Sequence, residues 1–187
     1  MKNFDLKIRR ATQNDCLFIA EAVVMGIGDC QTVVEYCGEN YIEVLEAIAG
    51  CEGTQYSYHN VFVAEVGGKV VGALVGYDGA NLYPLREGTF SVIARYKSEM
   101  PNVADETQPG EFYIDTLAVD PEFRNRGIGT TLLKYIVQWA GEQGFPEVGL
   151  IVDSENPQAM ELYKRVGFEV CGTKNFFGHN MWHMQIG

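Results

Sequence analysis

The sequence predicts one domain of mixed α/β structure, and three observations lead to that prediction. Stretches with the two-residue alternation of strands are interspersed with stretches of helical spacing, in the order strand, helices, hairpin, strand, helix, strand, helix, strand, strand. The length of 187 residues fits a single domain. Apolar residues make up 47% of the chain, which argues against disorder. We therefore expect one domain over residues 1–187.

The first elements are expected to be a short strand and two helices. Residues 6–10 alternate as a strand, and apolar periodicity over residues 16–25 and about 40–49 predicts the helices. The Asn14-Asp15 pair offers an N-cap for the first helix, and glycines end both helices.

A hairpin and an insertion are predicted next. Residues 61–66 and 69–77 are rich in strand-forming residues, and Gly67-Gly68 between them supply the positive φ of a tight turn. Gly72 and Gly76 inside the second run indicate a bulge or a close approach of backbones. Residues 80–110, a weakly amphipathic piece at 90–100 followed by an acidic loop, are expected to be an insertion at one edge of the domain.

The pattern is sharper in the last third of the chain. We predict a strand at 112–119, a turn at 120–127, a helix at 128–143, a strand at 148–152, a helix at 157–166, and closing strands at 168–171 and 181–186 around a loop at 174–180.

Charge excludes two classes of partner. The chain carries 14 basic and 25 acidic side chains, a net charge of −11, and it has no run of Lys and Arg that would bind nucleic acid or an anionic membrane. Seven acids and no basic residue lie in residues 99–122, and Arg124 and Arg126 follow at once. We expect an acidic acceptor side, to which Asp105, Glu106 and Glu111 contribute, and a positive side next to it.

Cysteine usage and the N-terminal sequence indicate a cytoplasmic protein. The five cysteines form an odd set without a CxxC pair, so we expect reduced thiols packed as small hydrophobes, Cys171 among them. The first residues lack the apolar region of a signal peptide, and no apolar stretch approaches the ~18 residues of a membrane span.

The turn at residues 117–129, LAVDPEFRNRGIG, is the strongest local feature. It joins a strand to a long helix, and glycines at the helix start leave first-turn N–H groups open to an anion. A Walker loop is excluded because no Lys follows the second glycine, and a dinucleotide fingerprint is excluded because its third glycine position is Leu132.

The RxxGxG pattern of Arg124–Gly129 resembles the acyl-coenzyme A site of the GNAT N-acetyltransferase superfamily. The segment ENPQAMELYKRVGFEV, from residue 155 to 170, resembles the second signature of that family, and the two occur in the right order. The resemblance implies the GNAT fold, in which a mixed, mostly antiparallel sheet splays between its fourth and fifth strands and has helices on both faces.

The resemblance also implies acetyl-CoA as the acyl donor and assigns residues to it. The strand backbone would hold the pantetheine arm, the N–H groups of the turn would surround the pyrophosphate, and one side chain after the next strand would bind the coenzyme; these residues are Leu117, Ala118, Val119, Arg124, Asn125, Arg126, Gly127, Ile128, Gly129, Thr130 and Asn156. The ordinary alternatives are core packing for Leu117 and Val119, a solvated charge for Arg126 and a plain N-cap for Asn156.

By the same resemblance Tyr163 would protonate the departing thiolate, with a structural tyrosine as the alternative. Asp115 is our candidate for the base that accepts the proton of the amine; Glu111, or water without a dedicated base, are the alternatives. His179 and His183 form no metal site without a third ligand, and either could line the acceptor pocket. A nucleophilic role of Cys171 is a remote option. Candidate walls of that pocket are Tyr83, Phe90, Tyr96, Phe176, Phe177 and Trp182.

The activity implied is transfer of an acetyl group to a primary amine, a small molecule or a peptide N-terminus, by direct attack in a ternary complex. A module that binds acyl-CoA without turnover is the alternative, and a nucleotide-binding domain is a third. Edge strands and an apolar last segment make a homodimer plausible.

Overall fold

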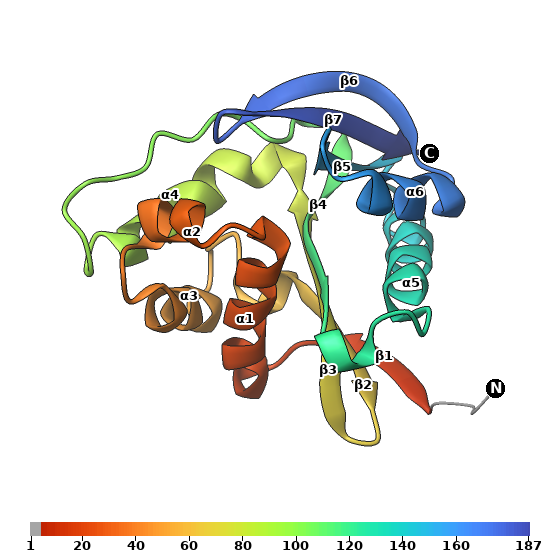
Figure 1. The fold of residues 1–187 in the computed structure, drawn as a ribbon, viewed down its shortest axis with the longest axis horizontal. Helices are drawn as coiled ribbons and strands as arrows, with labels where there is room; N and C mark the ends of the chain where they lie inside the picture. Colours follow the sequence, from red (N-terminus) through yellow and green to blue (C-terminus); the bar gives the residue numbers. More distant parts are fainter. Residues whose placement is uncertain (1–4) are drawn as a thin grey trace.

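The computed structural model describes residues 5–187, so the N-terminal residues 1–4 of our expectations lie outside it. It contains a seven-stranded sheet in the order β1-β2-β3-β4-β5-β7-β6 (Figure 1). Neighbouring strands are antiparallel except β4 and β5, which are parallel. The strands are β1 Leu6–Arg10, β2 Val61–Val66, β3 Lys69–Asp78, β4 Glu111–Val119, β5 Glu147–Asp153, β6 Glu169–Phe176 and β7 His179–Ile186.

Helices cover both faces of this sheet (Figure 1). One layer consists of α1 Cys16–Ile27, α2 Cys30–Cys37, α3 Tyr41–Gly50 and α4 Leu82–Ile93, and the other of α5 Ile128–Glu142 and α6 Pro157–Val166. Each layer has its own apolar core; Ile19, Val44 and Ile48 belong to the first, and Leu132 and Ile136 to the second. The predicted mixed α/β fold is confirmed.

Strands β4 and β5 part halfway along their length, as the expected splay requires. Their ladder runs from Glu111 opposite Glu147 to Ile114 opposite Leu150 and then ends. Beyond it, β4 continues beside β3, while β5 continues beside β7. The second half of β4 therefore presents one backbone edge to a gap in the sheet rather than to a neighbouring strand.

A β-bulge lies at the point where the two strands part. Ile114 pairs with Gly76 and Thr116 pairs with Val75, so Asp115 is an extra residue without an opposite residue on β3. Such a bulge bends the strand and redirects side chains. The bulge or close approach expected at Gly76 is confirmed, since an added Cβ there would lie 2.6 Å from the Phe112 ring.

The bulge also exchanges the faces of β4. Before it, Phe112 and Ile114 pack into the core beneath α5, and after it Leu117 and Val119 pack on that same side. Ala118 belongs to the opposite core beneath α1. Strict two-residue alternation would put Ile114 and Ala118 on the same face of the sheet. They lie on opposite faces because the extra residue, Asp115, shifts the alternation by one position.

Three helices, not two, follow β1. Helix α2 lies where the sequence reading placed a break, because Asp29 caps a new helix by accepting hydrogen bonds from the N–H groups of Gln31 and Thr32. Gly28 ends α1 in the left-handed conformation, with φ of 76°.

Only the first residues of the weakly amphipathic piece at 90–100 are helical. Helix α4 covers Leu82–Ile93, and Pro84 lies in its first turn, where the missing N–H costs nothing. An irregular segment from residue 101 to 108 then returns toward the sheet.

The closing hairpin is longer than expected. Strands β6 and β7 extend to Phe176 and from His179, so most of the expected loop at 174–180 is strand. Phe177 and Gly178 form the two-residue turn, with φ of 48° and 79°. The sequence does not predict this turn, because Phe is an unusual residue at positive φ.

Not all cysteines pack as small hydrophobes. Cys16 and Cys37 are buried and Cys51 is partly buried, but Cys30 and Cys171 are exposed. Cys171 lies on the edge strand β6, which has only one neighbour, and this corrects the expectation that it belongs to the core. Within residues 5–187 no helix is both long and apolar enough to cross a membrane.

Candidate functional site

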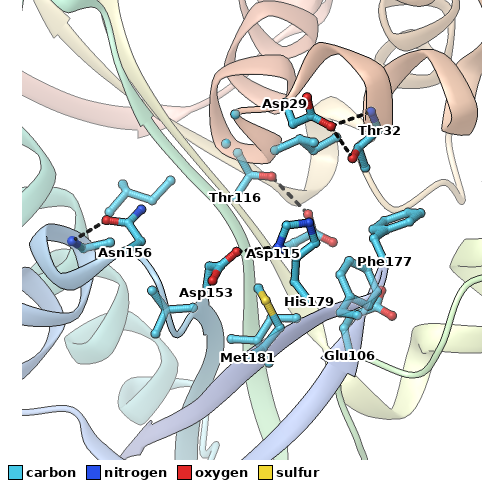
Figure 2. A pocket seen from close by; sticks show the side chains of 18 of the residues that line it. Asp29, Thr32, Glu106, Asp115, Thr116, Asp153, Asn156, Phe177, His179 and Met181 are labelled. Carbon is cyan, nitrogen blue, oxygen red and sulfur yellow. Dashed lines mark hydrogen bonds and ion pairs between the residues drawn. The ribbon is translucent and has the colours of Figure 1, made fainter.

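A cavity of about 680 Å³ opens where β4 and β5 part. Its walls come from the α1–α2 junction, the diverging ends of β4 and β5, the start of α6 and the β6–β7 hairpin (Figure 2). A volume of this size suits a small-molecule ligand or the reacting ends of two substrates. Five carboxylates contribute to the walls: Asp29, Glu106, Asp115, Asp153 and Glu155.

Asp115 lines this cavity from the bulge on β4. Its two oxygens each accept one hydrogen bond, from the Thr116 hydroxyl at 3.0 Å and from the Tyr77 hydroxyl at 3.0 Å. Burial, and next to it the nearby charge of Glu106, raise the pKa of Asp115 to about 7. A carboxyl group with that pKa can take up and release a proton near neutral pH.

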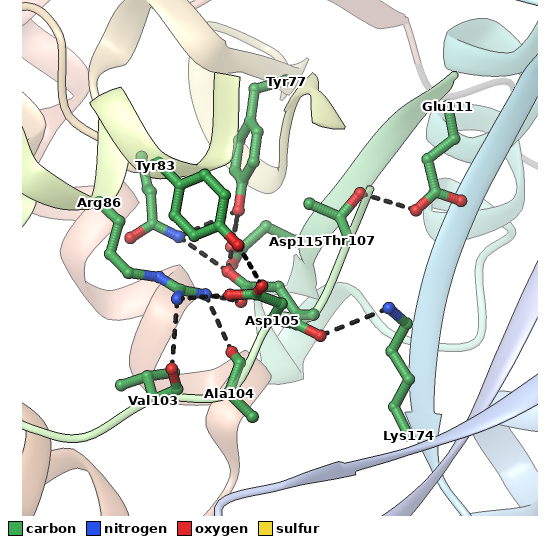
Figure 3. A network of polar contacts seen from close by, with 12 residues as sticks. Tyr77, Tyr83, Arg86, Val103, Ala104, Asp105, Thr107, Glu111, Asp115 and Lys174 are labelled. Atoms are coloured by element: carbon green, nitrogen blue, oxygen red, sulfur yellow. Dashed lines mark hydrogen bonds and ion pairs between the residues drawn. The ribbon is translucent and has the colours of Figure 1, made fainter. Parts of the chain in front are cut away.

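A buried polar network lies behind Asp115 (Figure 3). Glu106, 2% exposed, is paired with the guanidinium of Arg86 and accepts hydrogen bonds from Gln55 Nε2 at 2.9 Å and the Tyr77 hydroxyl at 3.2 Å. Burial raises the pKa of Glu106, while Arg86 opposes that shift. Asp105, on the exposed side of Arg86, completes the pairing at 3.0 Å.

Tyr163, on α6, also lines the cavity. Its ring packs edge-on against Phe168 with the ring centres 6.0 Å apart. Burial raises the pKa of Tyr163 to about 12, so its hydroxyl keeps its proton at neutral pH and can donate it.

Glu111, the alternative base, does not line the cavity. It is 1% exposed and accepts hydrogen bonds from Thr107 Oγ1 at 2.7 Å, His183 Nε2 at 2.8 Å and Gln185 Nε2 at 2.8 Å. Burial alone would raise the pKa of Glu111, but these donors together bring it below its ordinary value. Its contacts are those of a structural carboxylate.

The residues expected to hold the coenzyme lie between the cavity and the N-terminus of α5. Leu117 lines the cavity, and an added Cβ on Gly129 would lie within 4 Å of Leu117 and Val119, so the helix start packs against the end of β4. Gly127, with φ of 81°, precedes α5 without a side-chain cap, and the first bond of the helix runs from Thr131 N–H to the Gly127 carbonyl at 2.9 Å.

Consequently Ile128, Gly129 and Thr130 lie before the first intrahelical bond of α5, and their N–H groups point outward as donors. The positive φ of Asn125, 60°, turns the preceding chain toward the same helix end. Positive helix-dipole potential adds to these donors, so the geometry suits an anion such as a phosphate.

Both arginines of the turn contact the turn itself. Arg124 Nε donates to the Val119 carbonyl at 3.0 Å, and Arg126 Nη2 donates to the Glu122 carbonyl at 2.8 Å with its guanidinium over the Phe123 ring. They stabilise the turn and add positive potential beside α5.

Asn156 caps α6, since its Oδ1 accepts a hydrogen bond from Ala159 N–H at 3.0 Å. It also lines the cavity, so capping and coenzyme contact are compatible (Figure 2).

Several other expectations about the site are corrected. Of the six aromatic residues proposed as acceptor walls, only Phe176 and Phe177 line the cavity; Tyr83 and Phe90 line a separate shallow depression, Tyr96 is exposed, and Trp182 packs into the second core. His179 does line it and pairs with Asp153 at 2.9 Å, whereas His183 is buried against Glu111. Within residues 5–187 no cluster of three or more His, Cys, Asp and Glu could hold a metal.

The acidic stretch 99–122 is also less uniform than its composition indicated. Only Glu106 and Asp115 of its seven acids face the cavity. Asp105 and Glu106 pair with Arg86, and Asp120 pairs with Lys69 at 2.9 Å, so the expected block of uncompensated acids is wrong.

Sequence reasoning missed Gln55, Tyr77 and Arg86 entirely. They come from a loop, from β3 and from α4, and the contact between Tyr77 and Glu106 joins residues 29 apart in the chain. A tyrosine at the end of a strand and an arginine in a helix carry no local signal for such a network.

Comparisons with known proteins agree with this architecture. Residues 33–168 match the sequence profile of the Acetyltransferase (GNAT) family. The chain is 33% identical over 118 residues to the Mycobacterium tuberculosis protein named N-alpha-acetyltransferase RimI, which covers 63% of this chain and 58% of that protein. It is 32% identical over 99 residues to a mycothiol acetyltransferase from Propionibacterium freudenreichii, which covers 52% of this chain and 30% of that protein.

The aligned stretch spans only 18–30% of the length of the first curated relatives. Solved structures match over nearly the whole chain. An N-acetyltransferase from Staphylococcus aureus Mu50 has a TM-score of 0.82 and 26% identity, covering 96% of this chain and 100% of that one. A second structure, described as an acetyltransferase, has a TM-score of 0.80 and 32% identity, covering 96% and 97%.

Proposed function

The chain belongs to the acetyltransferase (GNAT) family, and from that premise we propose that it transfers the acetyl group of acetyl-CoA to a primary amine held beside Asp115. The observation that carries the proposal is the position of Asp115: a carboxyl group with a pKa of about 7 lies at a bulge, on the wall of the cavity between the parted strands. Direct transfer needs a proton acceptor at that place.

The residues present suit the acyl donor. When bound, acetyl-CoA supplies the acetyl group as a thioester. The first-turn N–H groups of α5, Ile128 to Thr130, would bind its pyrophosphate, and the edge of β4 at residues 117–119, which β5 does not pair with, would hold its pantetheine arm. Asn156 would contact the coenzyme while it caps α6. This route leads along β4 directly to Asp115.

Two side chains would move the protons. Asp115 would accept the proton that an ammonium group must lose before its nitrogen can attack the acetyl carbonyl. Tyr163, which keeps its proton at neutral pH, would donate one to the departing sulfur. Both line the same cavity, which supports transfer within one ternary complex.

The acceptor would be a cationic primary amine. Five carboxylates line the cavity, and the basic side chains among its walls are Arg86, which is already paired with Glu106, and His179, which is paired with Asp153. A peptide N-terminus and a small amine both meet that requirement, and the resemblance to a protein named for N-alpha acetylation supports the former.

An amine panel tests the proposal. We expect release of the CoA thiol from acetyl-CoA with at least one of the amines, polyamines, amino acids or peptides offered. Tyr163→Phe should lower kcat about 10–100-fold, because the sulfur loses its proton donor. Tyr135→Phe is the matched control, since Tyr135 is 39% exposed on α5, away from the cavity. Tight acetyl-CoA binding without CoA release for any amine would instead favour a non-catalytic binding module.

A further inference from the structure

The hydroxyl of Tyr77 lies between two carboxyl groups and has one proton to offer. Its oxygen is 3.0 Å from Asp115 Oδ2 and 3.2 Å from Glu106 Oε1, and it also accepts a hydrogen bond from Gln55 Nε2 at 3.0 Å (Figure 3). If both carboxyl groups are ionised, one of the two oxygen pairs has no hydrogen between its atoms. Two electron-rich oxygens then face each other in a buried place, which is unfavourable.

One additional proton removes that conflict. With a proton on Asp115 Oδ2, Asp115 donates to the Tyr77 oxygen, and the Tyr77 hydroxyl turns to donate to Glu106. Every contact around the phenol is then a hydrogen bond. The network is therefore complete only when Asp115 and Glu106 together hold one proton.

Arg86 decides where that proton resides. Its guanidinium pairs with Glu106 and is itself fixed by the carbonyls of Val103 and Ala104 at 3.2 and 2.9 Å. This cation favours the ionised form of Glu106. Among residues 5–187, no cation pairs with Asp115, and its hydrogen-bond donors there are the hydroxyls of Thr116 and Tyr77, so the shared proton belongs on Asp115.

We propose that Glu106 is a positioning residue for Asp115, and that it acts through the Tyr77 hydroxyl to make Asp115 a proton acceptor near neutral pH. The inference rests on the proposed function in one respect, that Asp115 takes the proton of the amine. In that step the N–H bond of the ammonium breaks, an O–H bond forms at Asp115, and the Tyr77 hydroxyl rotates from Asp115 to Glu106. Neither Glu106 nor Tyr77 changes its protonation state.

Other titratable groups lie near Asp115. Those with an electrostatic interaction with it include Tyr36 on α2, Tyr56 in the loop before β2, Tyr113 on β4 and Arg86 on α4. Asp29, Asp153, Glu155 and His179 line the same cavity as Asp115. The tyrosines are buried, and burial raises the pKa of each, so they stay neutral around pH 7. Glu106 is the carboxylate joined to Asp115 through the Tyr77 hydroxyl, and its negative charge opposes ionisation of Asp115.

The test is a ¹³C NMR titration of the aspartate side-chain carboxyl carbons, with Asp115 assigned from Asp115→Asn. In Glu106→Gln the pKa of Asp115 should fall by about one unit, because the opposing charge is gone. In Glu106→Asp, which disturbs packing more than Gln but keeps the charge, it should stay close to the wild-type value. A fall in Glu106→Asp as large as in Glu106→Gln would overturn the proposal, since packing alone would then explain the shift.

Asp105→Asn is the matched control, because it removes the other carboxylate partner of Arg86 without touching Tyr77. An equal fall of the Asp115 pKa in this variant would also overturn the proposal. In a Tyr77→Phe background the effect of Glu106→Gln should drop to half or less, and an undiminished effect would exclude the bridge through Tyr77.

The titration needs no substrate, so it gives an answer even if no amine is acetylated. Where turnover is measurable, the acidic limb of the pH profile of kcat/KM should move to lower pH in Glu106→Gln by the same amount as the NMR pKa. A limb that does not move with the NMR value would contradict the proposed function of Asp115 and leave the role of Glu106 standing.

Discussion

Glu111 and Asp115 lie four residues apart on the same strand, and their surroundings are opposite in character. Glu111 is nearly inaccessible and accepts hydrogen bonds from Thr107, His183 and Gln185. Asp115 accepts two hydrogen bonds from hydroxyl groups, and one of these hydroxyls, that of Tyr77, also contacts the carboxylate of Glu106. The pKa of Glu111 is lowered and that of Asp115 is raised to about 7.

Burial alone therefore does not separate a structural carboxylate from a candidate base. Burial raises the pKa of both carboxyl groups, but the donors of Glu111 stabilise its charge more than desolvation penalises it. Asp115 has fewer donors and a like charge close by, so its proton affinity rises. Counting donors and neighbouring charges explains the opposite pKa shifts, which burial alone does not.

The largest expected effect separates the two residues by activity. Asp115→Asn should lower kcat/KM about 10²–10³-fold at neutral pH, because the ammonium loses its proton acceptor. Steady-state kinetics with the best amine of the panel measures this. Glu111→Gln is the control and should keep kcat/KM, within the folded fraction; a comparable loss in that variant would make the two carboxylates equivalent and break the comparison.

The next effect separates them by stability. Glu111→Gln should lower the free energy of unfolding by about 1–3 kcal/mol, because two buried hydrogen bonds and one partly buried one lose their ionised acceptor. Denaturant unfolding at pH 7 measures it. Asp115→Asn should leave stability unchanged or raise it, since it removes a poorly compensated buried charge; destabilisation by both substitutions would refute the distinction.

A third test uses pH. Asp115 binds its proton more tightly in the native chain than at its ordinary pKa of 3.8, so its contribution to stability is full below that value and is lost as the pH rises through about 7. Glu111, with its lowered native pKa, contributes above its ordinary value of 4.5 and loses that contribution as the pH falls.

Between pH 4 and pH 8 the stability of Asp115→Asn relative to wild type should accordingly increase by about 1–2 kcal/mol, a value reduced for water that reaches the partly buried carboxylate. The stability that Glu111→Gln loses relative to wild type should become smaller below about pH 4. Thermal unfolding across this range checks both signs, and parallel curves for the two variants would count against the opposite shifts.

The smallest effects come from a matched pair of threonines. Thr107→Val and Thr116→Val each remove one hydroxyl donor, from Glu111 and Asp115 respectively. Thr107→Val should cost about 1 kcal/mol of stability. Thr116→Val should instead move the acidic limb of the kcat/KM profile to higher pH by about half a unit, because ionised Asp115 loses a donor. A stability loss only in Thr116→Val and a shifted pH profile only in Thr107→Val would contradict the roles that we give to Glu111 and Asp115.

The parts of the fold with local signals were predictable from sequence. Helix α6 agrees with the prediction at both ends, because Asn156, Pro157 and Gly167 mark its start and its finish. The Gly67-Gly68 turn and the uncapped start of α5 after Gly127 have equally local causes. Helix α2 was not predicted, because Asp29 was interpreted as part of the end of the preceding helix. The same residue is the N-cap of α2.

The network around Asp115 could not be predicted, because long-range pairing creates it. Gln55 and Glu106 are 51 residues apart, and the irregular segment that brings them together has no periodicity. The extra residue at Asp115 results from how β4 pairs with β3, and the residues next to Asp115 in the sequence do not indicate it. The roles of Asp115 and Tyr163 stay predictions, as does the homodimer.

The bulge also bears on how such a domain can change its chemistry over evolutionary time. Asp115 is the one residue of β4 between Phe112 and Val119 that has no partner on β3. Its neighbours Ile114 and Thr116 keep the ladder continuous and pack against the two layers whatever side chain stands between them. We therefore expect that a substitution at this position leaves both cores in place, so the proposed base occupies a position that strand pairing does not constrain.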